Sequence, residues 1–449
     1  MGTSSWREAV QGYVRPPVIA VFFLGISSGF PLTLILATLS LWLSREGVSK
    51  ADVGLFALTQ LPYTIKFLWA PLLDRLPLPV LTRLAGQRRS WLFLAQATLF
   101  AALLFLGASD PQSDLPMMAL AAVCVAFASA TQDIAIDAYR IEILKPEDQG
   151  YGAAGYVFGY RAGNLIAGIG TISLVALVDW HTAYHITAFA LLFGAAAALV
   201  MGEPARHDDA SADALEDRVR QRLDGREPTA AGRLGAWLFV ALIGPFLEFL
   251  RRPYALLILA FVFVYKWGDA MGQVMLAPLI VDLGFTNAEY IWANKTLGVV
   301  ALWIGTAFGA GLVKALGMYR ALLFTGVLMM VTNLLFAWLA LMGDVIWALA
   351  VAVLFEQLAT GLGLVVFVAY LSGLCNLAFT ASQYALLSSM AVFARSVMSA
   401  PSGFLVEAVG WPIFYVITTF AALPGLILLV FLWRNGIRVD NPALSMTGK

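Results

Sequence analysis

Charged residues are scarce in this chain, and their scarcity indicates the class of protein. Only 12% of the 449 residues are Asp, Glu, Lys or Arg, whereas 60% are hydrophobic. A soluble domain of ordinary composition carries roughly 25% charged residues. The low charge and the long apolar runs therefore predict a polytopic membrane protein rather than a soluble domain.

A basic surplus, a cysteine framework and catalytic motifs are also missing. The 28 Lys and Arg residues are balanced by 28 Asp and Glu, so no excess positive charge is present to neutralise a nucleic acid. Cys124 and Cys375 are the two cysteines, and neither has the spacing of a metal ligand. The sequence contains no HExxH, GxSxG or Cys/His cluster. We therefore expect no enzyme, no metal site, no cofactor and no structural disulfide.

Twelve apolar runs of about 20 residues are long enough to cross the hydrocarbon core of a bilayer. The first follows Arg15 without the pattern of a removable signal peptide, so we expect it to stay in the protein. The predicted spans cover residues 17–43, 51–73, 91–108, 115–138, 151–178, 182–201, 254–282, 289–313, 321–342, 345–370, 377–400 and 411–433.

Lysine and arginine in the loops predict the orientation. Nearly all of them fall on the side that holds both chain ends and the central loop, and the opposite side holds only Arg45, Lys50 and Arg395. Because cytoplasmic loops carry the excess of basic residues, we expect both termini and the central loop in the cytoplasm.

A charged segment divides the apolar runs into six and six. The stretch EPARHDDASADALEDRVRQRLDGREPTAAGR cannot bury a core and predicts a linker, and the apolar run after it predicts a helix lying in the membrane interface. This layout resembles a major facilitator transporter, in which two bundles rock about a midplane site. The expected fold is all-α: an N-terminal six-helix bundle at 1–201, a cytoplasmic linker with the interfacial helix at 202–252, a C-terminal six-helix bundle at 253–434 and a cytoplasmic tail at 435–449.

The segment between the second and third spans, APLLDRLPLPVLTRLAGQRRSWL, supports this layout. It resembles the major facilitator signature, an acid and a basic residue closing one helix and a basic cluster opening the next, although Ala70 stands where a glycine is expected. The resemblance implies a cytoplasmic gate formed by Asp74, Arg75, Arg88 and Arg89. The alternative is that these residues only cap helices and follow the charge asymmetry of the loops.

Two aspartates stand near the end of the fourth span. Asp133 and Asp137 are spaced i,i+4 and therefore share one helix face. An aspartate at the centre of a bilayer costs about 2.5 to 3.5 kcal/mol to insert, so two of them on one face require a reason. Two carboxylates on one face disfavour double ionisation, so one of them is expected to hold a proton reversibly, as proton coupling requires. Static ion pairing between helices is the alternative. The other charged residues inside predicted spans are Lys66, Arg161, Lys266, Asp269, Lys295 and Glu356.

Several of these segments together resemble one family. They include PYTIKFLWAPLLDR, ATQDIAIDAYR, GYRAGNLIAG, YKWGDAMG, NKTLG, LFEQLATGLG and FTASQYALLSS, and they are similar to the matching segments of AmpG, the muropeptide permease of the Gram-negative inner membrane. The resemblance implies proton-driven import of anhydromuropeptides, GlcNAc-anhydroMurNAc with or without stem peptides, and a link to β-lactamase induction. Acetyl-CoA transporters are a more distant branch, and they leave acetyl-CoA or another anionic metabolite as the alternative substrate; an uncoupled facilitator is a further alternative.

Polar residues within the spans suit such a substrate. Cations can pair with stem-peptide carboxylates, Arg161 in bidentate geometry, and amides and hydroxyls can bind sugar hydroxyls. The expected substrate-binding residues are Lys66, Gln132, Tyr160, Arg161, Asn164, Lys266, Asp269, Gln273, Asn294, Lys295, Glu356, Gln357, Gln383 and Tyr384. The expected partners are the substrate, protons and the lipid bilayer, with a monomer as the working unit. Glycines of the first and fifth spans, including Gly25, Gly29, Gly155, Gly159 and Gly163, are expected to let helices approach closely.

Overall fold

The computed structural model describes residues 11–205 and 243–436, which form helices and no strand. Within these described residues, ten helical segments are long and apolar enough to cross a membrane. All ten begin within a few residues of a predicted span and confirm those spans, although the segment ending at Val409 continues past the predicted end at 400. They are Pro16–Arg45, Gln87–Ala108, Leu115–Ile143, Trp180–Met201, Ala255–Asp282, Ala288–Leu316, Met318–Met342, Ile346–Gly373, Leu377–Val409 and Trp411–Arg434.

The two other predicted spans are helical but interrupted. Residues 51–73 form α4 (Lys50–Leu55), α5 (Leu61–Ile65) and α6 (Ala70–Arg75), with 3₁₀ turns between them. Residues 151–178 form α10 (Gln149–Leu165), a π-helical turn at Ile166–Gly170 and α11 (Thr171–Val175). Twelve spans are consistent with this arrangement. Proline, which removes a helical hydrogen bond, stands at the start of both α5 and α6.

The chain forms two compact units. Unit 1 comprises Met1–Phe249 and Cys375–Ser389, and unit 2 comprises Leu250–Leu374 and Met390–Lys449. The first part of α23 (Thr380–Ser399), which the sequence analysis places in the C-terminal bundle, thus packs with unit 1. Most of the predicted linker and tail lies outside the described residues; of the predicted interfacial helix, residues 243–250 are described and are helical.

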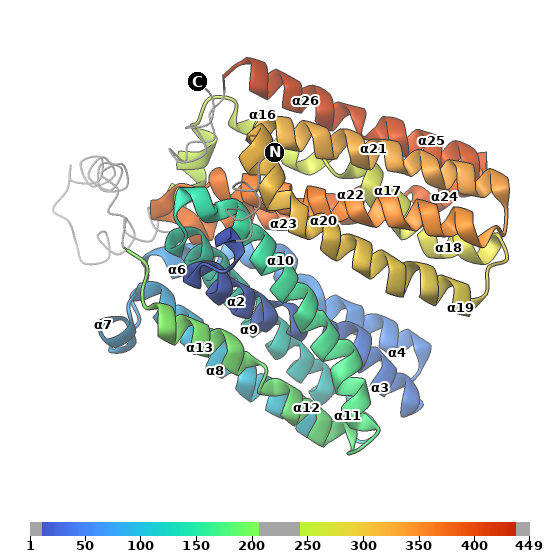
Figure 1. The fold of residues 1–449 in the computed structure, drawn as a ribbon. Helices are drawn as coiled ribbons and strands as arrows, with labels where there is room; N and C mark the ends of the chain where they lie inside the picture. Colours follow the sequence, from blue (N-terminus) through green and yellow to red (C-terminus); the bar gives the residue numbers. More distant parts are fainter. Residues whose placement is uncertain (1–10, 206–242, 437–449) are drawn as a thin grey trace, which may run out of the picture. The chain divides into compact units, whose positions relative to one another are not determined.

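Unit 1 is built on α2 (Pro16–Thr33), α8 (Gln87–Ala108), α9 (Leu115–Ile143) and α10, and α2 lies along α10 while α8 lies along α9 (Figure 1). The first helix passes through a π-helical turn at Leu34–Thr38 into α3 (Leu39–Arg45). Pro31, inside α2, removes one helical hydrogen bond just before that turn. The outer helices are α7 (Leu81–Ala85), α12 (Trp180–Ala188) and α13 (Leu191–Met201).

Side-chain caps fix where two spans begin. The Asp114 carboxylate accepts a 3.0 Å hydrogen bond from the Met117 N–H at the start of α9, and Asp179 accepts a 2.9 Å bond from the Thr182 N–H at the start of α12. The bond from Thr182 lowers the pKa of Asp179 below its usual range. These caps satisfy backbone groups that no helical partner reaches.

Glycine contacts explain how closely α2 and α10 pack. A Cβ atom at Gly159 would lie 1.9 Å from the Phe22 carbonyl oxygen, and one at Gly29 would lie 2.1 Å from the Tyr160 carbonyl oxygen. The expectation that glycines let these helices approach is therefore confirmed.

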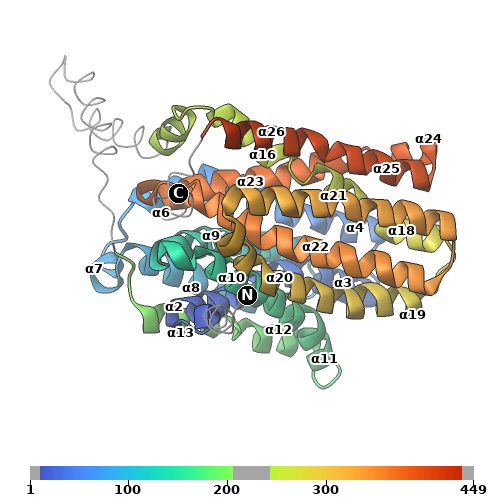
Figure 2. The ribbon, with the colours of Figure 1, turned by 45° about the horizontal axis from the view of Figure 1, so that its top comes forward.

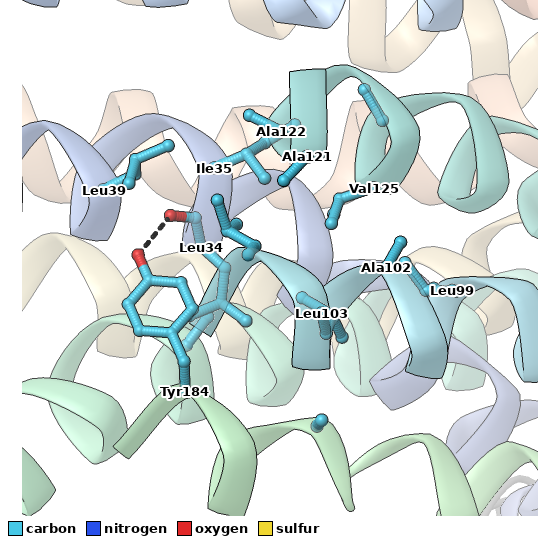
Figure 3. Packing of buried hydrophobic residues seen from close by; sticks show 14 of the residues in the cluster. Leu34, Ile35, Leu39, Leu99, Ala102, Leu103, Ala121, Ala122, Val125 and Tyr184 are labelled. Carbon is cyan, nitrogen blue, oxygen red and sulfur yellow. Dashed lines mark hydrogen bonds between the residues drawn. The ribbon is translucent and has the colours of Figure 1, made fainter. Parts of the chain in front are cut away.

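The apolar core of unit 1 is continuous across several helices. Leu34, Leu39 and Leu103 are fully buried in it. The buried Tyr184 side chain enters the same region, where its hydroxyl donates a 3.1 Å hydrogen bond to the Leu34 carbonyl oxygen (Figure 3). That carbonyl lies at the π-helical turn, so the tyrosine bonds a backbone group at an irregular part of the helix.

In unit 2, α20 (Gly298–Leu316), α21 (Met318–Met342) and α22 (Ile346–Gly373) pack side by side (Figure 2). The other helices of this unit are α16 (Ala255–Val264), α17 (Trp267–Val274), α18 (Leu276–Asp282), α19 (Asn287–Tyr290), α24 (Ser402–Val409), α25 (Trp411–Ala421) and α26 (Leu423–Arg434), with a π-helical turn at Ile291–Leu297 before α20.

Candidate functional site

The two aspartates that the sequence singles out are buried inside unit 1. Asp133 is 7% exposed and Asp137 is 4% exposed, and both project from α9, one turn apart. The two carboxylates have different hydrogen-bond and charge partners, so their chemistry differs.

Asp133 is held by a neutral donor. The Ser28 hydroxyl, on α2, donates a 2.6 Å hydrogen bond to Asp133 Oδ1. The Ser28 oxygen also lies 2.8 Å from the Tyr156 hydroxyl, which comes from α10. Since Ser28 has one proton and gives it to Asp133, Tyr156 donates to Ser28 while Asp133 is ionised. Protonation of Asp133 would allow this chain of hydroxyls to reverse.

Asp137 is held by cations. Lys66 Nζ lies 3.8 Å from Asp137 Oδ2, and the Arg140 guanidinium lies 3.5 Å from Asp137 Oδ1. The Lys66 ammonium also interacts electrostatically with Asp133. Two buried cations therefore face two buried carboxylates, so the formal charge of these four groups is zero when both acids are ionised. We call Ser28, Lys66, Asp133, Asp137, Arg140 and Tyr156 the central polar cluster.

Arg140 was assigned to a loop by the sequence analysis, and the structure corrects this. The α9 helix runs to Ile143, five residues past the predicted end at 138, so Arg140 lies within the helix and is fully buried. Its guanidinium carbon lies 5.3 Å from the centre of the Tyr156 ring and 5.2 Å from that of Tyr384. Two aromatic faces stabilise the buried cation. Its i,i+3 spacing from Asp137 was the available sequence signal.

Other predicted binding residues of unit 1 lie around this cluster with protein partners of their own. Gln132 is fully buried and donates a 2.8 Å hydrogen bond to the Ser27 carbonyl oxygen. Asn164 accepts a 3.1 Å bond from the Thr33 hydroxyl. The rings of Tyr160 and Tyr156 are 6.2 Å apart, and Arg161 is half-buried on α10.

Two of the predicted gate residues, Asp74 and Arg88, form a network with Glu142. Arg88 Nη2 lies 2.8 Å from Asp74 Oδ1 and 2.6 Å from Glu142 Oε1, and Arg88 Nε lies 3.0 Å from both Glu142 oxygens. The Arg88 side chain is only 9% exposed. The sequence analysis did not single out Glu142, because the predicted span ended before it.

Asp74 also joins this network to α23. Its carboxylate accepts hydrogen bonds from the backbone N–H groups of Ala381, at 3.1 Å, and Ser382, at 2.8 Å, and one from the Ser382 hydroxyl. These are free N–H groups of a helix N-terminus, where a negative charge is favoured. The Arg75 guanidinium lies 5.3 Å from the centre of the Phe379 ring.

The N-terminus of α8 has its own acid partner. The Glu203 carboxylate accepts hydrogen bonds from the backbone N–H groups of Arg88, at 2.7 Å, and Arg89, at 3.0 Å. Arg89 therefore contributes a backbone group here, while its guanidinium lies over the Phe93 ring at 5.6 Å. Glu203 lies at the start of the predicted linker and was another residue missed from the sequence.

Unit 2 holds a second group of charged and polar side chains, Lys266, Asp269, Gln273, Glu356 and Thr360. Gln273 Nε2 donates to Glu356 Oε1 at 2.9 Å, and the Thr360 hydroxyl donates to the same oxygen at 3.0 Å. Asp269 interacts electrostatically with Lys266 and with Arg395. The sequence analysis counted Arg395 with the outer loops, but it lies inside α23.

The remaining predicted binding residues are not brought into this group by any described hydrogen bond or ion pair. Lys295 is exposed and lies 5.9 Å from the Tyr290 ring, to whose hydroxyl Asn294 donates a 3.0 Å bond. Gln357 is half-buried next to Gly298. Gln383 accepts a 2.8 Å bond from the Asn376 N–H and donates to the Pro245 carbonyl oxygen at 3.2 Å and to the Glu248 carboxylate, so its amide links two segments of unit 1.

Within residues 11–205 and 243–436, no group of three or more His, Cys, Asp or Glu side chains is arranged to hold a metal ion. The chemistry available is therefore that of buried acids, cations and hydroxyls. Such groups can bind a proton and an anion, and they compete for the same partners.

Known proteins resemble this chain in sequence and in fold. Residues 21–401 match the Major Facilitator Superfamily. A transporter of Rickettsia felis named AmpG 4 is 33% identical over 414 residues, covering 92% of this chain and 95% of that protein. The anhydromuropeptide permease of Escherichia coli K12 is 35% identical over 420 residues, covering 93% of this chain and 80% of that protein.

Two solved structures share the fold at low identity. FucP, a major facilitator transporter crystallised in the outward conformation, superposes with a TM-score of 0.64 and 13% identity, covering 94% of this chain and 99% of that one. The proton:xylose symporter XylE superposes with a TM-score of 0.62 and 14% identity, covering 94% and 96%.

Proposed function

Because the chain belongs to the AmpG permease family of the major facilitator superfamily, we propose that it is a secondary transporter that imports anhydromuropeptides together with protons. The substrate is GlcNAc-anhydroMurNAc with or without stem peptides, carried from the periplasm to the cytoplasm across the bacterial inner membrane. Family membership makes the protein a multi-pass transporter rather than an enzyme. The charge distribution of the loops supports cytoplasmic termini.

The observation that carries the proton coupling is the unequal pairing of two adjacent acids. Asp137 faces Lys66 at 3.8 Å and Arg140 at 3.5 Å, whereas Asp133 is held at 2.6 Å by the neutral Ser28 hydroxyl. Two neighbouring cations stabilise the charged form of a carboxylate. A buried carboxylate whose only donor is neutral takes up a proton more readily. Asp133 is therefore the proton acceptor of the pair in our proposal.

Competition for positive charge then couples the proton to the substrate. When Asp133 is protonated, Lys66, Asp137 and Arg140 leave one uncompensated positive charge, which attracts a carboxylate of the substrate. When Asp133 loses its proton toward the cytoplasm, it competes again for Lys66, and the substrate anion is released. The proton and one substrate carboxylate thus bind together with no change in net charge.

A pH gradient can supply the driving force. A proton that crosses together with one substrate carboxylate moves no net charge, so the gradient of protons and not the membrane potential drives this step. An inward gradient of one pH unit contributes about 1.4 kcal/mol, which corresponds to roughly tenfold accumulation. The membrane potential adds about 2.3 kcal/mol per 100 mV only for a substrate that, with its proton, carries one net positive charge.

The gate network supports the same transport cycle. Asp74 is bonded both to Arg88 and to the first N–H groups of α23. We propose that this junction closes the cytoplasmic end in the conformation described and opens when the carrier faces inward. Opening the junction breaks the hydrogen bonds from the N–H groups of α23 to the Asp74 carboxylate. Water molecules can replace these donors when the gate is solvated.

Uptake into proteoliposomes tests the proposed function. The purified full chain is reconstituted, and uptake of labelled anhydromuropeptide is compared with uptake of labelled acetyl-CoA, each with and without an inward proton gradient. We expect gradient-dependent accumulation of the muropeptide alone. Accumulation of acetyl-CoA instead would overturn the substrate, and muropeptide equilibration that ignores the gradient would overturn the coupling.

A further inference from the structure

Glu356 is a deeply buried acid in unit 2 that the central polar cluster does not use. It stands ten residues after the start of α22 at Ile346, which is about 15 Å along the helix axis. This residue is 4% exposed. Each carboxyl oxygen of such a residue requires a hydrogen-bond partner or a proton.

The two oxygens of Glu356 are unequally satisfied. Oε1 accepts from the Gln273 amide at 2.9 Å and from the Thr360 hydroxyl at 3.0 Å. Oε2 is buried and has no hydrogen-bond partner among the residues that the structure describes. No described ion pair involves Glu356. An ionised carboxylate with one buried, unsatisfied oxygen is far less stable than the neutral acid.

The nearby acid Asp269 opposes ionisation of Glu356 as well, whereas the Lys266 ammonium favours it. The Gln273 amide also lies 3.5 Å from Asp269 Oδ1, so one amide separates two acids from different helices. Asp269, Lys266 and the Tyr415 phenol are the titratable groups that interact with Glu356, while Arg395 acts on Asp269. The Tyr415 hydroxyl donates to the Gly272 carbonyl oxygen at 3.2 Å, so its proton is used elsewhere.

We infer that Glu356 is a second proton-binding site, in unit 2, and that it holds its proton in this conformation. A metal cation does not suit the site, because an N–H and an O–H donor point at Oε1 where a cation would need acceptor oxygens. This gives Glu356 a role different from the substrate contact expected from the sequence. Deprotonation would set two carboxylates, Asp269 on α17 and Glu356 on α22, against each other across Gln273. That repulsion is relieved when the two helix segments separate.

Infrared spectroscopy of the purified full chain tests the protonation directly. At neutral pH we expect a carbonyl stretching band of a protonated, buried carboxyl group that is absent in Glu356→Gln, an uncharged isostere. The same band should persist in Asp133→Asn and in the control Glu289→Gln, a half-buried acid that accepts a hydrogen bond from the Thr286 N–H at the start of α19. An unchanged band in Glu356→Gln, or no such band in the unmutated protein, would overturn the inference.

A transport measurement tests whether this proton moves, and this part rests on the proposed function. The proton-to-substrate ratio, measured from the gradients at which net muropeptide flux stops, should be lower by about one in Glu356→Gln than in the unmutated protein. An equal ratio in both would show that Glu356 keeps its proton throughout and would overturn the transport role. If muropeptide is not transported at all, the proposed function fails while the infrared result still stands.

Discussion

Lys66 Nζ lies 3.8 Å from Asp137 Oδ2, and both side chains are buried. That distance allows electrostatic attraction but exceeds an ordinary hydrogen bond. The pair is therefore attractive without being fixed in one geometry. An ion pair that must exchange partners during each transport cycle benefits from this property.

Removing Lys66 should destabilise the protein more than removing the whole pair. Lys66→Met leaves Asp137 with Arg140 as its cation, and we expect a loss of about 3 kcal/mol, the low end for breaking a buried pair. Lys66→Met/Asp137→Asn should recover part of that loss, because the cluster regains a formal charge of zero although Arg140 loses its acid partner. Thermal unfolding of both variants in detergent measures the difference. A double variant no more stable than Lys66→Met would mean that the two residues are not energetically paired.

The sequence analysis predicts that Arg161 offers a positive charge to the substrate. Arg161→Ala should abolish binding of acidic muropeptides while the protein still folds, and Arg161→Lys should recover only part of the affinity, because lysine lacks the planar fork. Equilibrium binding to the purified variants measures this. Unchanged affinity in Arg161→Ala would make Arg161 a structural residue.

The gate can be tested with the native cysteines. Cys375 is buried in the segment that leads into α23, and Cys124, which is exposed, is replaced by serine to leave one thiol. Asp74→Asn weakens the bonds to the N-terminus of α23, so alkylation of Cys375 by a membrane-permeant maleimide should become roughly tenfold faster, the effect of about 1.4 kcal/mol on the opening equilibrium. Asp282→Asn, a change of a partly exposed acid in unit 2, serves as the control.

If the gate prediction is wrong, Cys375 will react at the same rate in Asp74→Asn and in Asp282→Asn. The Asp74 contacts would then stabilise the fold without controlling access. A lower rate in Asp74→Asn would contradict the prediction equally.

The sequence was sufficient to locate ten membrane spans and the acids Asp133 and Asp137 inside one of them, because both features depend on local signals. Ten spans follow directly from runs of apolar residues, and Asp133 and Asp137 are conspicuous because charge inside such a run is costly. The end of α9 was misplaced for the same reason. Tyr139, Arg140 and Glu142 lower the local hydropathy, yet the helix continues through them because buried partners compensate their polarity.

Partners from distant parts of the chain could not be found in this way. Glu142 and Glu203 reach Arg88 or its backbone only after the helices have packed, and Glu203 sits next to a charged stretch that resembles a solvated linker. Ser28, which bonds Asp133, is a small residue in an apolar helix and carries no distinctive pattern. Hydropathy predicts which residues are buried, but not which of them meet.

Packing between α2 and α10 gives a stability prediction with an internal control. Gly159→Ala places a methyl group 1.9 Å from the Phe22 carbonyl oxygen, whereas Gly311→Ala, in α20, meets nothing within 4 Å. We expect Gly159→Ala to destabilise the protein by about 1 to 3 kcal/mol. Gly311→Ala should be neutral or slightly stabilising, since alanine favours helix. Thermal unfolding of both variants decides this, and equal stability would show that the helices can separate at little cost.

The two aspartates should behave differently when each is made neutral, since their partners differ. Asp133→Asn mimics the protonated acid that we propose for the outward-facing carrier, and Asn can still accept from the Ser28 hydroxyl. Substrate binding and counterflow should survive, while accumulation driven by a proton gradient should be lost. Asp137→Asn removes the acid that faces both Lys66 and Arg140, so two buried cations would lose their shared partner.

For Asp137→Asn we therefore expect lower thermal stability, by about 3 kcal/mol or more, in addition to the loss of accumulation. Counterflow and gradient-driven uptake are measured side by side for both variants, at protein levels matched in the liposomes. Accumulation at the unmutated level in Asp133→Asn would remove this carboxyl from the coupling mechanism. A different outcome would be that Asp137→Asn keeps counterflow while Asp133→Asn loses substrate binding. The proton acceptor would then be Asp137, because the residue that is protonated in the loaded carrier must bind substrate in its neutral form.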